Sequence, residues 1–126
     1  MSKAVLDAVK DSMKEMEINY WFGEAPSPPK YPYFTGEYQE PESFSEDGEQ
    51  DTQFILNGFA RGEGAFLSLE NAKEQIKEYL QDGRLVSTEK SVVAIFYANA
   101  LANLPTGDAE LKRIQINLTI KEMNGR

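Results

Sequence analysis

An alternation of apolar and polar residues near the end of the chain constrains the fold most strongly. Every second residue from 114 to 120 is aliphatic, and the residues between them are polar; the four are Ile114, Ile116, Leu118 and Ile120. Successive side chains of a β-strand point to opposite faces, so this pattern predicts a strand with one buried face. Burying four aliphatic side chains contributes about 6–12 kcal/mol before the loss of chain entropy is subtracted, so we expect the strand to pack against helices.

Two segments have the spacing of amphipathic helices. Apolar residues recur every three or four positions from residue 3 to residue 18, which predicts a first helix. A second helix is predicted from Ser68, read as its N-cap, to Gly83, read as the glycine beyond its end. Its buried stripe would be Leu69, Ala72, Ile76, Tyr79 and Leu80.

Three further segments, 33–38, 53–61 and 91–98, are rich in aromatic and β-branched residues and predict strands. The run 91–98 is almost continuously apolar, so we expect it at the centre of the sheet. The order helix, strand, strand, helix, strand, strand favours an α+β fold. We expect one domain, 1–126, with two helices on one face of a mostly antiparallel sheet of about four strands.

One segment carries almost all of the net charge. Residues 31–60 contain seven acids and no Lys or Arg, whereas the net charge of the whole chain is −8. Asp47-Gly48 is typical of a hairpin turn, so residues 37–52 are predicted to form a long, projecting acidic β-hairpin. The acids are candidate interaction residues: Glu37, Glu40, Glu42, Glu46, Asp47, Glu49 and Asp51.

Trp21 and Arg61 are two further candidate interaction residues. Tryptophan is enriched at binding hot spots, but a lone tryptophan after an amphipathic helix is more often part of a core, and we favour the core for Trp21. Arg61 opens the sequence Arg-Gly-Glu-Gly, which resembles a glycine-rich anion loop. Because Glu63 would repel phosphate and no Lys-Ser/Thr pair follows, a flexible loop between strand and helix is the preferred interpretation.

The composition excludes several kinds of chemistry. The chain has no Cys and no His, which removes disulfides, thiolate metal sites and the usual proton shuttle. Carboxylates at 47, 49 and 51 could bind a hard cation, but Gly48 interrupts the calcium-loop pattern, and a solvated acidic loop is favoured. A pair of glycosidase carboxylates is disfavoured because Glu37, Glu40 and Glu42 lie in a polar run. We predict no enzyme activity, catalytic residue, metal or cofactor.

Charge and hydropathy also limit the expected partners. An acidic chain is repelled by phosphate, so stable binding to nucleic acid or to an anionic membrane is disfavoured. No signal-peptide region and no run of about 18 apolar residues is present, so we expect a cytosol-like compartment.

Several segments together carry a family resemblance. They are the first helix, Trp21-Phe22-Gly23, the proline-rich crossing into 31–38 (Tyr-Pro-Tyr-Phe-Thr-Gly-Glu-Tyr), the strand 54–62, the helix from Leu69 and the closing strand 111–120. In their order and aromatic placement they resemble the tail-terminator (tail-completion, minor tail) proteins of long-tailed bacteriophages and prophages.

The resemblance implies a structural subunit of the virion tail, without catalytic residues, that is present in the host cytoplasm during assembly. It implies a homo-oligomeric ring, commonly hexameric, that caps the tail tube and joins it to the head connector; the expected partners are the chain itself, the tail tube protein and the head-tail connector protein.

The acids have two possible roles in such a ring. Pointed into the lumen, residues 37–51 would repel DNA phosphates and let DNA slide; pointed at the tube or connector, they would bind a basic surface in a salt-sensitive way. An alternative function for the chain is a monomeric acidic protein-binding module, or a nucleic-acid mimic whose hairpin imitates phosphates.

Overall fold

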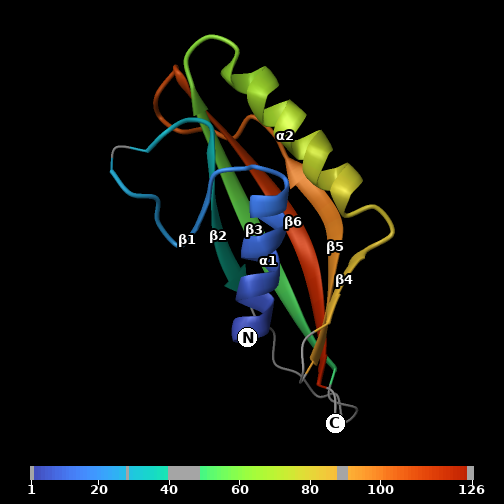
Figure 1. The fold of residues 1–126 in the computed structure, drawn as a ribbon. Helices are drawn as coiled ribbons and strands as arrows, with labels where there is room; N and C mark the ends of the chain where they lie inside the picture. Colours follow the sequence, from blue (N-terminus) through green and yellow to red (C-terminus); the bar gives the residue numbers. More distant parts are fainter. Residues whose placement is uncertain (1, 28, 40–48, 88–90, 125–126) are drawn as a thin grey trace.

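The alternating segment forms β6 (Leu111–Asn124), a central strand of a six-stranded sheet in the computed structural model of the chain (Figure 1). The structure describes residues 2–27, 29–39, 49–87 and 91–124. Two helices, α1 (Lys3–Glu15) and α2 (Ala65–Tyr79), lie over one face of the sheet. The predicted α+β class, the two helices and the alternating strand are therefore confirmed.

The sheet is mixed, with the strand order β1-β2-β3-β6-β5-β4. Its other strands are β1 (Tyr20–Phe22), β2 (Tyr33–Gln39), β3 (Glu49–Arg61), β4 (Arg84–Ser87) and β5 (Ser91–Leu101). Neighbouring strands are antiparallel except β1 and β2, which are parallel.

The predicted count of about four strands is wrong because the two edge strands were missed. β1 has three residues and β4 has four, and such short segments cannot show a periodicity. The central position predicted for residues 91–98 is also wrong. β5 lies next to the edge strand β4, whereas β3 and β6 occupy the middle of the sheet.

The core lies between the inner face of the sheet and the two helices. The four aliphatic residues of β6 are at most 2% exposed, as the alternation predicts. Buried residues of both helices belong to the same cluster as β3 and β6, which is why both helices cover one face: Val5, Val9 and Met13 from α1, Leu69 and Ile76 from α2, and Phe54 and Leu56 from β3.

The start of α1 is fixed to the end of β6 by a buried polar contact. The hydroxyl of Ser2, the N-cap residue, accepts a hydrogen bond from the Val5 N–H and donates one of 2.5 Å to Oε2 of Glu122. Glu122 is only 7% exposed, on the face of β6 that α1 covers. The contact therefore gives a partner to a carboxylate that would otherwise be buried alone.

The N-cap predicted for α2 is wrong. Ser68 lies inside the first turn, where its N–H donates to the Gly64 carbonyl at 2.9 Å. The N-cap is Gly64, in the left-handed conformation (φ 76°) and without a side-chain cap. Glycine adopts this conformation at little cost, so the helix begins one turn earlier than the serine suggested.

Candidate functional site

The acidic segment enters and leaves the sheet through paired strands. Glu37 lies on β2, where its carboxylate accepts a hydrogen bond of 3.0 Å from Asn57 Nδ2. Asp51 lies on β3, with its Oδ1 3.8 Å from Lys121 Nζ of β6. Glu49 is the first residue of β3. The candidates Glu40, Glu42, Glu46 and Asp47, and the predicted Asp47-Gly48 turn, lie outside the described residues.

Arg61 is at the far end of β3 from the acidic segment. Ten residues separate it from Asp51, about 33 Å along a strand. Its guanidinium is 2.8 Å from Asp108 and 5.9 Å from the centre of the Tyr31 ring. Arg61 thus has partners in its own chain and is far from the acidic candidates, while the rings of Tyr31 and Tyr33 connect it to Trp21.

Trp21 lies at the sheet edge and is not in the core, contrary to the interpretation we favoured. It is half-buried on β1, and its ring meets the Tyr33 ring edge-on at 6.1 Å. Trp21 pairs with Thr35 in the register of β1 and β2, on the face that the helices do not cover. The opposite side of β1, from which Tyr20 projects, faces α1.

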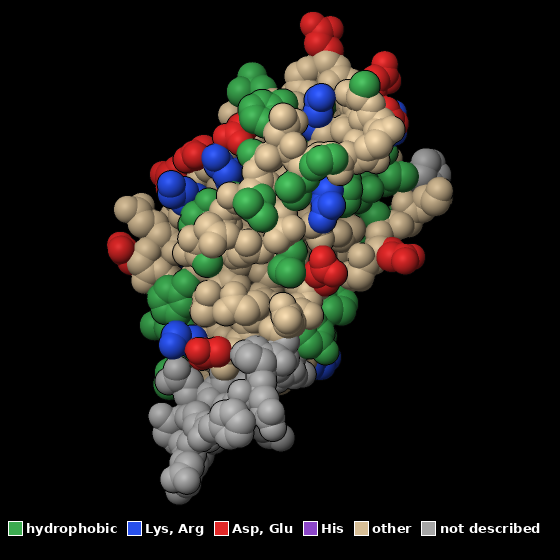
Figure 2. All heavy atoms as spheres, turned by 180° about the vertical axis from the view of Figure 1, so that it is seen from behind, with side chains coloured by type: hydrophobic (Ala, Val, Ile, Leu, Met, Phe, Trp, Pro, Cys, Tyr) green, Lys and Arg blue, Asp and Glu red, His purple; other side chains and the backbone are tan. Residues whose placement is uncertain are grey.

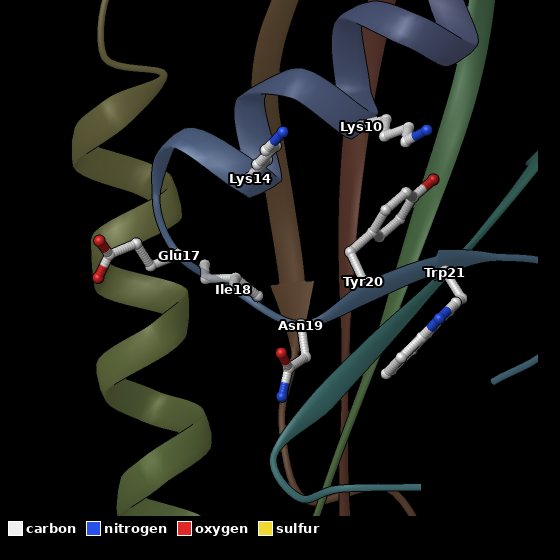
Figure 3. Close-up of a pocket in the computed structure, with 7 residues that line it drawn as sticks. All are labelled: Lys10, Lys14, Glu17, Ile18, Asn19, Tyr20 and Trp21. Atoms are coloured by element: carbon white, nitrogen blue, oxygen red, sulfur yellow. The ribbon is translucent and has the colours of Figure 1, made fainter. Parts of the chain in front are cut away.

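A cleft of about 450 Å³ opens between α1 and β1 (Figure 3). Its existence depends on how α1 ends. Glu17 takes the left-handed conformation (φ 60°), and the Ile18 N–H donates to the Met13 carbonyl at 3.0 Å, which turns the chain back beneath the helix. The residues that line the cleft are Lys10, Lys14, Glu17, Ile18, Asn19, Tyr20 and Trp21.

The two lysines of the cleft are one helical turn apart and form no ion pair within the described part of the chain. In Figure 3 both project from α1, and Tyr20 projects from β1, while the carboxylate of Glu17 points away from all three. The cleft is therefore a basic site in a chain whose net charge is −8.

Tyr20 forms part of the wall of this cleft with its ring. Its hydroxyl is buried and has no hydrogen-bond partner among the described residues, and burial raises the pKa of this phenol above its ordinary value. A Cβ atom on Gly36 would collide with that hydroxyl and would lie 2.8 Å from the Phe54 ring. Gly36 is thus the residue that lets Tyr20 lie flat against β2.

None of the described helices covers the outer face of the sheet, opposite α1 and α2 (Figure 2). Polar side chains form two hydrogen-bonded groups there. Arg113 Nη2 donates to Asn57 Oδ1 at 2.9 Å, and Asn57, which is 7% exposed, donates on to Glu37. In the second group, Gln115 donates to Asn117 at 2.9 Å, and Asn117 donates to Asn99 at 2.6 Å.

Three exposed apolar side chains also belong to this face. By the strand register, Leu85 of β4, Leu101 of β5 and Met123 of β6 belong to the outer face. They are 70%, 50% and 45% exposed, and Figure 2 shows green side chains in groups across this face. By the register Leu101 is next to Gln115, whereas Leu85 and Met123 are near Lys121. Exposed apolar groups gathered on one face are typical of a surface that contacts another protein.

The described residues contain no group of three or more acids placed to hold a metal ion, and none of the described helices is long and apolar enough to cross a membrane. The arrangement offers hydrogen bonds, charge and apolar area for binding.

Sequence reasoning missed the two surfaces that the structure assembles. In the sequence, acids are interleaved with Lys10 and Lys14, a pattern that is typical of a solvated helix face. Their spacing of four residues was the available signal, but the missed strand β1 forms the other wall of the cleft. Asn57 and Arg113 meet only through the pairing of β3 with β6, which no local pattern shows.

Neither the protein-family models nor the curated proteins with which the chain was compared gave a match.

Proposed function

We propose that the protein is a structural subunit of a phage or prophage tail, of the tail-terminator kind, which assembles with copies of itself into a ring. The ring would cap the tail tube and join it to the head connector. The observation that carries the proposal is the outer face, which no described helix covers and on which Leu85, Leu101 and Met123 are exposed. A ring subunit needs such a face, because each copy contacts two neighbours through different surfaces.

Two further features support a structural role. The order of helices, aromatic segments and closing strand resembles the tail-terminator family. The charge of the chain is also concentrated at one place: residues 40–51 contain six of its acids, whereas the rest of the chain has 15 acids and 13 bases. A copy can therefore present an acidic region to one partner and a nearly neutral face to another.

The test is assembly of the full chain, alone and mixed with tail tubes of the same phage or prophage. We expect light scattering to show oligomers and negative-stain microscopy to show rings, or caps at tube ends. Leu85→Glu and Leu101→Glu should prevent both while the circular dichroism spectrum stays unchanged. Leu67→Glu is the matched control, because Leu67 is 63% exposed but lies on α2, away from the outer face.

A chain that stays monomeric at all concentrations and does not bind tubes would refute the proposal. If such a monomer instead bound a basic protein in competition with DNA, the acidic binding module or nucleic-acid mimic would take its place.

A further inference from the structure

The cleft between α1 and β1 has the chemistry of a site for an acidic, extended segment. Lys10 and Lys14 project over it and have no acidic partner within the described part of the chain. Two unpaired ammonium groups one turn apart match carboxylates spaced along a peptide. The side chain of Glu17 points away from the lysines, so it does not neutralise them.

The opposite wall of the cleft offers backbone hydrogen bonds. β1 is an edge strand: β2 pairs with one side of it, and no described strand pairs with the other. Unpaired N–H and C=O groups of an edge strand accept an additional strand from another chain. A segment that lay along Tyr20–Phe22 would therefore be held by its backbone while its side chains reached the lysines.

The chain itself contains a segment of the matching kind. Residues 40–48, between β2 and β3, carry four acids and no base, and Phe44 adds an apolar side chain for the cleft. Nine residues span at most about 31 Å, so a segment fixed at both ends can extend about 15 Å from the sheet. That reach is enough to enter a cleft on an adjacent copy.

The topology favours a neighbouring copy over the same copy. β2 begins beside the cleft, where Phe34 pairs with Tyr20, and it ends at Gln39, five residues further along. That is about 16 Å further along the strand. Gln39, to which the acidic segment is attached, therefore lies at the end of β2 away from the cleft, and this favours the cleft of a neighbouring copy over that of the same copy.

We propose that this cleft binds residues 40–48 of a second copy of the chain, with their carboxylates facing Lys10 and Lys14 and their backbone along β1. This inference rests on the proposed function, since it describes one contact between neighbours in the ring. A contact between two different surfaces of the same chain repeats around an axis, which is the geometry that a ring requires.

The first test measures binding of a labelled synthetic peptide of residues 39–49 to the full chain by fluorescence anisotropy. We expect Lys10→Glu/Lys14→Glu to weaken binding at least tenfold, and the neutral pair Lys10→Gln/Lys14→Gln to weaken it by less. The control Lys30→Glu/Lys112→Glu changes the net charge equally, at two lysines that do not line the cleft, and should alter binding less than twofold. Equal binding by the cleft and control variants, or no binding by the wild type, would overturn the inference.

A second test identifies which copy supplies the segment. Because the chain has no cysteine, Lys14→Cys and Ser45→Cys are unique labels. Oxidation of a mixture of the two single variants should give a disulfide-linked dimer. If the double variant instead formed the link within one chain at high dilution, the assignment to a second copy would be wrong.

The outcomes separate this inference from the proposed function. If rings form equally well with Lys10→Glu/Lys14→Glu, the cleft is not the contact, although the ring stands. If the peptide binds the cleft but no ring or cap ever forms, the cleft assignment stands and the tail function falls.

Discussion

Gly58 occupies a crowded place in the middle of the sheet, and a single added methyl group there should destabilise the protein. Gly58 lies on β3 between β2 and β6, paired with Phe34 on one side and with Ile114 on the other. A Cβ atom would collide with the Phe34 ring, lying 2.6 Å from its Cζ and 2.9 Å from Cγ2 of Ile114. Both neighbours are 1% exposed, so neither can move into solvent to make room.

The expected cost of Gly58→Ala follows from two opposed effects. Overpacking a core costs about 1–3 kcal/mol, and replacing glycine with alanine recovers about 0.4–1 kcal/mol by restricting the unfolded chain. Because both neighbours are buried, the overpacking cost should lie in the upper part of its range, and we expect a net loss of about 1–2 kcal/mol in the free energy of unfolding, or roughly 3–10 °C in Tm. Urea unfolding followed by fluorescence of Trp21, which packs on Tyr33, measures this loss.

A double-mutant cycle tests the cause. Phe34→Leu alone should cost about 1–2 kcal/mol because it removes part of a buried ring. If the added methyl group collides with the Phe34 ring, Gly58→Ala combined with Phe34→Leu should cost at least about 1 kcal/mol less than the sum of the two single losses. Strict additivity, or a Gly58→Ala variant as stable as the wild type, would refute the reasoning.

Three further predictions concern polar groups. Tyr20→Phe removes a buried hydroxyl without a partner, so the free energy of unfolding at pH 7 should stay equal or rise by about 1–2 kcal/mol. Burial raises the pKa of Tyr20, so the wild type should lose stability as the pH rises above about 10, and this variant should lose less; urea unfolding at pH 7 and pH 10.5 compares them. Asn57→Ala removes the bridge between Glu37 and Arg113 and should cost about 1–3 kcal/mol in urea unfolding, whereas the exposed Asn99→Ala should cost less than about 1 kcal/mol. The Glu110 N–H, and next the Arg61 guanidinium, hold the pKa of Asp108 below its ordinary value of 3.8. The stability that results is present above that value and is lost as the pH falls through the lower pKa of the folded state. Asp108→Asn should therefore reduce the fall in stability between pH 4 and pH 2.

The parts of the fold that were predictable are those in which a single element carries its own pattern. The alternation from Ile114 to Ile120 placed β6 correctly, and the spacing of Val5, Val9 and Met13 placed α1. In both, burial on one face repeats often enough along the element to show its period.

The parts that were missed depend on contacts with distant segments. β1 is a strand because Tyr20–Phe22 pairs with Phe34–Gly36, beyond the proline-rich crossing, and three residues alone carry no period. The position of β5 beside β4 was not predictable for a similar reason, because the four residues of β4 are too few to show a period. Val93 and Ile95 of β5 are at most 1% exposed because they belong to the core, so their burial suggests a central strand, although only β4 (Arg84–Ser87) lies between β5 and the edge of the sheet.

The candidate site was predictable in its charge and not in its shape. The acidity of residues 40–51 is visible in the sequence, and so is the fact that this acidic run separates two strand-like segments. The cleft that we assign to it requires three features at once: the left-handed turn at Glu17 just after α1, the reversal of the chain through Ile18, and the pairing of β1 with β2. Only the structure brings Lys10 and Lys14 over an open strand edge.

The two contact surfaces should respond to salt in opposite ways, and this separates their roles in assembly. A contact between Lys10, Lys14 and carboxylates is weakened as the Debye length falls from about 10 Å at 0.1 M salt to about 3 Å at 1 M. Burial of Leu85, Leu101 and Met123 on the outer face is apolar, and sulfate strengthens such burial. We therefore expect rings to dissociate in 1 M NaCl but to persist in sulfate of equal ionic strength. That result would mean that assembly depends on both surfaces: the cleft determines which copies meet, and the outer face supplies the buried area.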